Sequence, residues 1–257
     1  MKFLLIIFFS IIFVNVEAQR RIINGTTIKP SDAPYQAVLL YPNVSVAWCG
    51  GSFLSEKFVI SAAHCTFGRE HSKFKISGGG YWFEPYSTKF NVEKIVNHEK
   101  YNDSMTYNDI TIFILKTIKN FPERITFVKL VKKNYEPKNG ELMMITGYGK
   151  TEKLLDNNKV LKRAFVPIYN HQKCVKDYNR ILIAGEVTKN MICAGYEKGE
   201  IDSCFGDSGG PLLHADTKEL VGITSWGGIC GGRYQPGVYT KVSKYINWIE
   251  DVMTKTF

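Results

Sequence analysis

Short apolar stretches recur along this chain from residue 22 onward, and they limit its fold more than any other feature. They are rich in β-branched and aromatic residues and are separated by clusters of Gly, Pro, Asn and Lys. Strands bounded by turn residues produce this pattern, so the sequence predicts an all-β protein. The clearest predicted strands cover residues 36–41, 58–61, 110–115, 142–146 and 220–225.

Only the end of the chain has the pattern of a helix. Within residues 243–253, Ile246, Ile249 and Met253 recur at a spacing of three and four residues and form one apolar stripe. Farther back, Lys, Asn, Pro and Gly concentrate at residues 131–140, which predicts a boundary between parts of about 22–130 and 131–257. The pattern leaves open whether the strands form two β-barrels or one sandwich.

The first 18 residues have the pattern of a secretory signal peptide. Lys2 is followed by an apolar run at residues 3–14 and by a cleavage point at Ala18. A membrane span needs about 20 apolar residues, so a membrane anchor is the weaker interpretation. We therefore expect a secreted protein without membrane contact once this segment is removed.

Six cysteines follow the predicted signal, and an even number in an exported chain indicates three disulfides. Their spacing alone leaves the connectivity open. Metal binding is the competing interpretation, but the chain has no Cys-x-x-Cys and its five His lack ligand spacing. The sequence therefore predicts no metal and no cofactor. The cysteines are Cys49, Cys65, Cys174, Cys193, Cys204 and Cys230.

The chain carries a formal net charge of +9. Residues 1–21 hold three of its 33 basic residues and one of its 24 acidic residues, so without them the charge is about +7. A basic surface can attract nucleic acid or sulfated sugars, but the Lys residues are scattered and form no basic run or nucleic-acid motif. We expect a basic, soluble protein without a nucleic-acid partner.

Three separate stretches form one chemical pattern. In the first, Gly206-Asp207-Ser208-Gly209-Gly210-Pro211, glycines allow a Ser and its backbone amides to approach a substrate closely. In the others, His64 stands beside Cys65, and Asp109 opens a predicted apolar strand. Each alone has a structural explanation, as a turn, a packed His or a cap. Together they follow the order His, Asp, Ser that one group of serine hydrolases shows.

From Ile22 almost to its end, the chain resembles the trypsin family of serine proteases. The resemblance implies that Ser208 attacks the scissile carbonyl, that His64 transfers its proton, and that Asp109 orients the imidazole. The backbone amides of Gly206 and Ser208 would form the oxyanion hole. The family fold is all-β, with two six-stranded antiparallel β-barrels, the active site in the cleft between them and a C-terminal helix.

The resemblance also implies a specificity pocket for Arg or Lys. Asp202 matches the residue at the pocket base, where a buried carboxylate needs a cationic partner. Gly227 and Gly237 match pocket walls that leave room for a long side chain, and Ser225 matches the residue that hydrogen-bonds the catalytic Asp. The implied substrate-binding set is Asp202, Ser203, Ser225, Trp226, Gly227 and Gly237.

The same resemblance describes activation. Cleavage after Arg21 would remove a propeptide of residues 19–21 and free the amino group of Ile22, which in the family pairs with the residue matched by Asp207. Because Asp202 predicts a preference for Arg, we expect the enzyme to activate itself. The resemblance pairs the cysteines as Cys49–Cys65, Cys174–Cys193 and Cys204–Cys230.

The chain departs from the family pattern at several positions. Phe205 replaces a polar residue at the pocket rim, Tyr148 replaces a Trp, and about five extra residues stand near 180–186. The family's calcium loop uses paired carboxylates, but residues 78–91 offer only Glu84, so we expect no structural calcium.

Sequons begin at Asn24, Asn43 and Asn102, and the last two are the candidate glycosylation sites because Asn24 adjoins the activation junction.

The main alternative function is an inactive homologue that acts as a binding or decoy protein, yet the triad, nucleophile loop and junction show no substitution. A shift to apolar specificity has only Phe205 in its favour, and a glycan-binding module leaves the triad unexplained. We expect protein and peptide substrates, protein inhibitors as partners, and a monomer.

Overall fold

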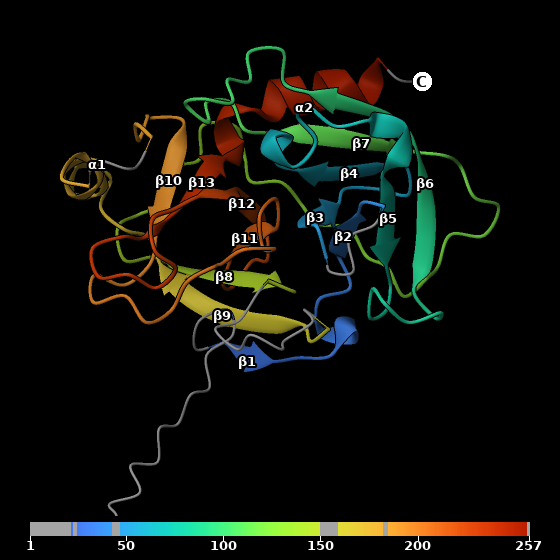
Figure 1. The fold of residues 1–257 in the computed structure, drawn as a ribbon, viewed down its shortest axis with the longest axis horizontal. Helices are drawn as coiled ribbons and strands as arrows, with labels where there is room; N and C mark the ends of the chain where they lie inside the picture. Colours follow the sequence, from blue (N-terminus) through green and yellow to red (C-terminus); the bar gives the residue numbers. More distant parts are fainter. Residues whose placement is uncertain (1–21, 23–24, 43–46, 150–158, 182–184, 256–257) are drawn as a thin grey trace, which may run out of the picture.

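The computed structural model describes residues 22, 25–42, 47–149, 159–181 and 185–255, which form two antiparallel β-sheets side by side (Figure 1). The predicted signal peptide at 1–18, the propeptide at 19–21, and the sequons at Asn24 and Asn43 lie outside the described residues. Within the described residues, the helices are too short or too polar to cross a bilayer.

The first sheet is a closed antiparallel barrel with the strand order β2-β3-β4-β7-β6-β5. Strand β7 shows why these segments become strands: its Thr-Ile-Phe-Ile-Leu sequence is β-branched or apolar throughout, and all five residues are buried. The strands are β2 (Gln36–Leu40), β3 (Cys49–Phe53), β4 (Phe58–Ser61), β5 (Lys75–Gly78), β6 (Thr88–Asn97) and β7 (Thr111–Leu115).

The second sheet has the order β1-β9-β8-β11-β12-β13-β10, with β1 (Thr26–Thr27) added at its edge. A bridge between Ile168 and Ala194 joins the chain after β9 to β10, so the six remaining strands close on themselves. The expectation of two six-stranded barrels is therefore confirmed. The strands are β8 (Leu142–Gly147), β9 (Lys162–Pro167), β10 (Met191–Ala194), β11 (Pro211–His214), β12 (Leu220–Trp226) and β13 (Gly237–Lys241).

The C-terminal helix α2 (Ile246–Thr254) lies across the first barrel (Figure 1). The prediction that only the end of the chain is helical is wrong, because α1 (His171–Asn179) is a second helix. Most of its side chains are polar, and the buried ones are few. Its start does carry a signal, since the Asn170 side chain accepts a hydrogen bond from the Lys173 amide at 2.9 Å as an N-cap. Within the described ranges, four short 3-10 helices cover Pro30–Asp32, Ala63–Cys65, His71–Lys73 and Val242–Lys244.

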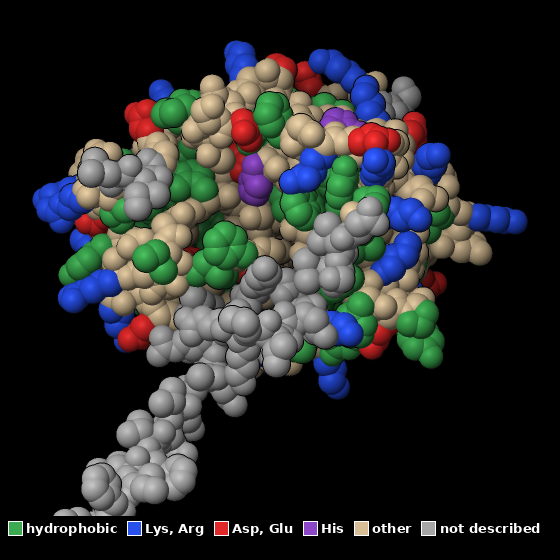
Figure 2. All heavy atoms as spheres, in the orientation of Figure 1, with side chains coloured by type: hydrophobic (Ala, Val, Ile, Leu, Met, Phe, Trp, Pro, Cys, Tyr) green, Lys and Arg blue, Asp and Glu red, His purple; other side chains and the backbone are tan. Residues whose placement is uncertain are grey.

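A polar contact joins the two barrels at the level of the site. The Thr146 hydroxyl of β8 donates to the Gln36 side-chain oxygen of β2 at 2.8 Å, and both side chains are buried. Because buried polar groups need partners, this contact fixes the relative position of the two strands. On the face shown in Figure 2, Lys and Arg side chains are scattered over the surface, with acidic side chains between them.

Candidate active site

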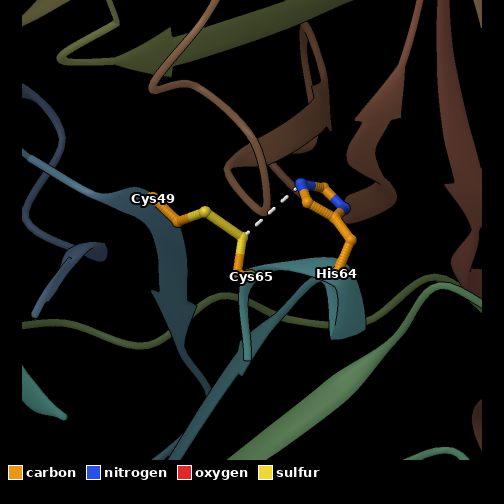
Figure 3. A group of neighbouring side chains, drawn as sticks. All are labelled: Cys49, His64 and Cys65. Atoms are coloured by element: carbon orange, nitrogen blue, oxygen red, sulfur yellow. Dashed lines mark hydrogen bonds between the residues drawn. A yellow bond between two sulfur atoms is a disulfide. The ribbon is translucent and has the colours of Figure 1, made fainter. Parts of the chain in front are cut away.

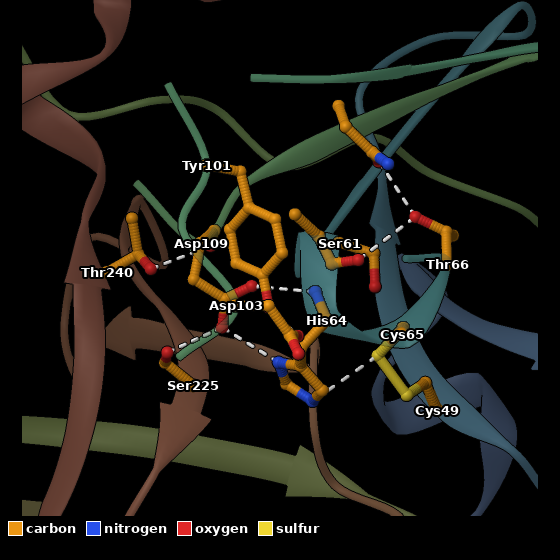
Figure 4. A network of polar contacts seen from close by, with 12 residues as sticks. Cys49, Ser61, His64, Cys65, Thr66, Tyr101, Asp103, Asp109, Ser225 and Thr240 are labelled. Atoms are coloured by element: carbon orange, nitrogen blue, oxygen red, sulfur yellow. Dashed lines mark hydrogen bonds and ion pairs between the residues drawn. A yellow bond between two sulfur atoms is a disulfide. The ribbon is translucent and has the colours of Figure 1, made fainter. Parts of the chain in front are cut away.

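The imidazole of His64 and the carboxylate of Asp109 are in direct contact. His64 lies on the 3-10 helix Ala63–Cys65 after β4, and Asp109 lies just before β7, which pairs with β4. Nδ1 of His64 is 2.8 Å from Oδ2 of Asp109, and the His64 amide donates to Oδ1 at 2.9 Å (Figure 4). The two bonds fix both the ring and its backbone.

Two hydroxyl groups from the second barrel support Asp109. The Ser225 hydroxyl at the end of β12 donates to Asp109 Oδ2 at 2.5 Å, and the Thr240 hydroxyl of β13 donates to the Asp109 carbonyl at 2.7 Å. The predicted Ser225 contact is therefore present in the structure. Thr240 was missed, because nothing in its sequence surroundings distinguishes it from an ordinary strand residue.

His64 and Asp109 each shift the pKa of the other. Burial alone lowers the pKa of His64, but the Asp109 carboxylate outweighs it and Asp103 adds to the effect, so this pKa lies above its ordinary value. Burial raises the pKa of Asp109, yet His64 and the hydrogen bonds from His64 and Ser225 hold it below its usual range. The site is thus arranged to stabilise an imidazolium next to an ionised carboxylate.

The nucleophile loop docks against the first barrel. The Gly50 amide of β3 donates to the Ser208 carbonyl at 2.8 Å. Gly209 has φ +76, and a Cβ there would lie 2.7 Å from the Gly50 carbonyl, so only glycine fits this position. Among the described residues no hydrogen bond joins the His64 ring to the Ser208 hydroxyl. In free enzymes this contact is often long and tightens when substrate binds.

The loop also positions two backbone amides. Gly206 has φ +96, and within the described part of the chain neither its amide nor that of Ser208 donates to a protein acceptor. Two such amides beside a Ser could bind the oxygen of a tetrahedral intermediate. The Asp207 side chain between them points inward, where Oδ1 accepts from the Gly149 amide at 2.8 Å and Oδ2 from the Cys204 amide at 3.0 Å.

Asp207 has no charged partner among the described residues, although it is only 2% exposed. Burial raises its pKa to about 6, and the two backbone hydrogen bonds only partly oppose that change. Ile22 is buried in the core, and no hydrogen bond or ion pair among the described residues joins it to Asp207. Arg21 lies outside the described residues.

A cavity of about 260 Å³ opens beside Ser208 and brings the predicted substrate-binding residues together. Asp202 lies in it with 5% of its surface exposed. Its Oδ2 accepts from the Gly231 amide at 3.1 Å, whereas Oδ1 is buried without a hydrogen-bond partner among the described residues. Burial raises the pKa of Asp202 to about 7. The residues that line the cavity are Asp202, Ser203, Cys204, Phe205, Ser208, Thr224, Ser225, Trp226, Gly227, Gly228, Cys230 and Gly237.

Glycine keeps the inside of the cavity open. A Cβ on Gly237 would lie 2.8 Å from Oδ1 of Asp202 and 3.0 Å from the Tyr239 hydroxyl, so any side chain there would cover the carboxylate. Tyr178 of α1 supports the wall from outside: its hydroxyl donates to the Pro236 carbonyl at 2.6 Å and accepts from the Gly228 amide at 3.1 Å. Sequence analysis did not find Tyr178, because it lies on the helix that was missed.

Three disulfides are present, and they join Cys49 to Cys65, Cys174 to Cys193 and Cys204 to Cys230. The first lies beside the imidazole, with Cys65 Sγ 3.7 Å from His64 Nε2 (Figure 3). Cys49, His64 and Cys65 are the described side chains that come close enough to share a metal ion. A disulfide offers no thiolate, so this group does not fit a metal site.

Two exposed apolar side chains stand next to the cysteines of the cavity-lining disulfide. Phe205 and Ile229 are 75% and 73% exposed, and the Cys204–Cys230 disulfide holds their segments together. Of the predicted extra stretch at 180–186, residues 182–184 lie outside the described part. A Cβ on Gly185 would lie 3.5 Å from the Met105 carbonyl and 4.0 Å from the ring of Trp226, so Gly185 lies beside a residue that lines the cavity. The remaining sequon residue, Asn102, is exposed.

A hydrogen-bonded His–Asp pair on the first barrel and a Ser on a glycine-rich loop docked against that barrel are the parts that define the class of Ser-His-Asp hydrolases. The family model described as Trypsin matches residues 22–249, and the chain therefore belongs to the trypsin family of serine proteases.

Three relatives show the extent of the similarity. Trypsin 5G1 of Aedes aegypti is 34% identical over 232 residues, which cover 90% of this chain and 85% of that protein. A vitellin-degrading protease of Bombyx mori is 34% identical over 234 residues, or 91% and 86% of the two chains. The clotting factor G beta subunit of Tachypleus tridentatus is 31% identical over 245 residues, or 90% and 79%.

Proposed function

We propose that this chain is a secreted serine endopeptidase that cleaves peptide bonds after Arg or Lys. The observation that carries the specificity is Oδ1 of Asp202, which is buried at the cavity without a hydrogen-bond partner among the described residues. An unpartnered buried carboxylate is costly, and a guanidinium or ammonium group in the cavity removes that cost. Phe205 at the rim acts on neighbouring subsites, while Asp202 sets the primary preference.

The proposed reaction passes through an acyl-enzyme. Ser208 Oγ attacks the scissile carbonyl carbon while Nε2 of His64 takes the hydroxyl proton, and Asp109 stabilises the imidazolium. The amides of Gly206 and Ser208 donate to the oxyanion of the tetrahedral intermediate. His64 then gives its proton to the leaving amine as the C–N bond breaks. Water, deprotonated by His64, attacks the ester in the same way and releases the acid and the Ser208 hydroxyl.

The test is the initial rate of the chain that begins at Ile22 on matched peptides ending in Arg, Lys, Phe or Leu. We expect kcat/KM for Arg and Lys to exceed the others by about 10²-fold or more. Ser208→Ala should lower kcat by about 10⁶-fold. Asp202→Asn should remove the preference for basic residues, whereas Asp216→Asn, an exposed acid on the β11–β12 turn, should keep it. Folded protein that cleaves none of the peptides would contradict the proposal.

Activation is part of the proposal. Cleavage after Arg21 would release the Ile22 amino group, a cation that can pair with buried Asp207 and order the nucleophile loop. Since Arg21 fits the proposed specificity, the mature enzyme should cleave its own precursor. The Ser208→Ala precursor should stay uncut alone and be cut when active enzyme is added. A purified Ser208→Ala precursor that matures unaided would contradict self-activation.

We further propose protein and peptide substrates, protein inhibitors of serine proteases as partners, and a monomeric enzyme. The dispersed Lys and Arg side chains favour no nucleic-acid partner (Figure 2). An inactive homologue that acts as a decoy is not favoured, because the chain keeps the His64–Asp109 contact and the open Asp202 cavity on which the proposed reaction depends. Secretion rests on the signal-like residues 1–18 and the three disulfides.

A further inference from the structure

A second carboxylate lies beside the imidazole of His64. Asp103 is exposed, and Figure 4 shows its side chain next to the His64 ring. It is close enough to add to the rise in the pKa of His64. The reaction proposed above gives it no role, because Asp109 already holds Nδ1. Among the described residues no ion pair engages Asp103, although the chain as a whole is basic.

The position of Asp103 is fixed by its own loop. Asn102 and Tyr107 exchange two backbone hydrogen bonds, of 3.0 Å and 3.2 Å, so Asp103 starts the tip of a small hairpin between β6 and β7. The Tyr101 hydroxyl donates to Asp103 Oδ1 at 2.8 Å, and the Tyr101 ring packs edge-on against Phe67 with centroids 5.3 Å apart. One oxygen is therefore held by the protein, and Oδ2 accepts no hydrogen bond from the described residues.

This hairpin tip and the wall of the Asp202 cavity both approach Gly185. A Cβ on Gly185 would touch both the Met105 carbonyl at the tip and the ring of Trp226 in the cavity wall, at 3.5 Å and 4.0 Å. A substrate with its basic side chain in the cavity and its carbonyl carbon at Ser208 has its preceding residue only about 3.8 Å farther along, between Cα atoms. In a substrate placed so that His64 can reach its scissile bond, the side chain of that residue would lie near His64 and Asp103.

We propose that Asp103 is a specificity-determining residue that selects Arg or Lys immediately before the cleaved residue, so that the enzyme prefers paired basic residues. The inference rests on the proposed function. An oriented, unpaired carboxylate at this point attracts a guanidinium or ammonium group and disfavours an acid. The chain itself contains such a pair, since Arg20 precedes Arg21 at the proposed activation junction.

The experiment compares three peptides that differ only before the cleaved residue, ending in Arg-Arg, Ala-Arg and Glu-Arg ahead of one reporter group. The enzyme begins at Ile22 and is made in a host that adds no N-glycans, because Asn102-Asp103-Ser104 is a sequon. The variants are Asp103→Asn, the charge reversal Asp103→Lys, and Asp216→Asn as a control with the same charge change. The readout is the ratio of kcat/KM between peptides for one enzyme, which cancels any change in the fraction folded or in His64 basicity.

We expect the wild type to cleave Arg-Arg faster than Ala-Arg by about tenfold, as a partly exposed charge-assisted contact provides. Glu-Arg should be slowest, and high salt should shrink the differences. Asp103→Asn should abolish the preference, Asp103→Lys should place Glu-Arg above Arg-Arg, and Asp216→Asn should keep the wild-type ratio.

The outcomes separate this inference from the proposed function. A wild type that cleaves Ala-Arg and Arg-Arg equally well contradicts the role of Asp103 and leaves the Arg specificity intact. A preference for Arg-Arg that survives in Asp103→Asn and Asp103→Lys also overturns the inference. Failure of the wild type on all three peptides contradicts the proposed function itself.

Discussion

The carboxylate of Asp207 lies in the space that a side chain at position 149 would fill, and the Gly149 amide donates to it at 2.8 Å. This contact holds Asp207, the residue before Ser208, against the end of β8. No cation among the described residues reaches its carboxylate there. Burial then raises the pKa of Asp207 to about 6 from 3.8. Between these two pH values the folded chain keeps a proton that the unfolded chain has lost, so stability falls as the pH rises.

The first prediction concerns cleavage and stability. Above pH 6, ionised Asp207 should lower the free energy of unfolding of the uncut chain by about 3 kcal/mol. The freed Ile22 amine should offset this loss by pairing with the carboxylate. Ser208→Ala protein cut after Arg21 by a separate protease should therefore melt about 6 °C above the uncut form at pH 8, with a smaller difference at pH 5. Asp207→Asn should remove the pH dependence of this difference. Equal melting temperatures at pH 8 would contradict the pairing.

The second prediction concerns ligand binding by Asp202, whose pKa burial raises to about 7. A cation can pair only with the ionised carboxylate, so a proton must leave when the ligand binds below that pH. The Kd of benzamidine should thus rise about tenfold per pH unit below 7 and level off above it. Calorimetry in buffers of different ionisation enthalpy measures the released proton. A Kd that does not change between pH 5 and 8 would show that Asp202 does not hold the amidine.

The third prediction concerns the loop that binds calcium in the family. Lys89 of β6 points into it and donates to Ser77 Oγ at 2.9 Å, to Ser87 Oγ at 2.7 Å and to the Trp82 carbonyl. The Arg124 guanidinium donates hydrogen bonds to the carbonyls of Gly79 and Tyr86 and so joins the two ends of the loop.

Lys89 therefore supplies a fixed positive charge inside the loop. Lys89→Met leaves its oxygen partners without that donor and should cost about 1–3 kcal/mol, or several degrees in melting temperature. A calcium chelator should leave the wild-type melting curve unchanged. Lys75→Met, at an exposed position on the neighbouring strand β5, serves as the control. A large loss of stability with chelator would show that an ion, not Lys89, holds the loop.

Sequence pattern predicted the strands well where β-branched and apolar residues are continuous. The predicted strand at 58–61 coincides with β4, and those at 36–41 and 220–225 differ from β2 and β12 by one residue. The pattern could not distinguish barrels from a sandwich, because closure depends on pairings distant in sequence such as Ile168 with Ala194. Helix α1 was missed since only Cys174, Asp177 and Tyr178 are buried on it.

The candidate site was predictable where a short motif carries the chemistry. His64, Asp109 and Ser225 meet as expected, and Asp202 lines one cavity with Ser208. Supporting residues such as Thr240 and Tyr178 were not predictable, because their roles arise from contacts between elements and their types are common in strands and helices. Asp103 belongs to the same group, since only the hairpin between β6 and β7 brings it to the imidazole.

The last prediction separates the roles of two disulfides. Cys204–Cys230 closes 26 residues and Cys174–Cys193 closes 19, so each should stabilise the fold by about 3 kcal/mol in the chain-entropy account. Only the first pair lines the Asp202 cavity. The double Ala variant of Cys204 and Cys230 should therefore raise KM for Arg peptides at temperatures where it is folded, whereas the matched variant of Cys174 and Cys193 should lose mainly melting temperature. If both variants lose stability equally and neither changes KM, the cavity wall keeps its shape without the disulfide, and backbone contacts such as that between Gly231 and Asp202 must hold it.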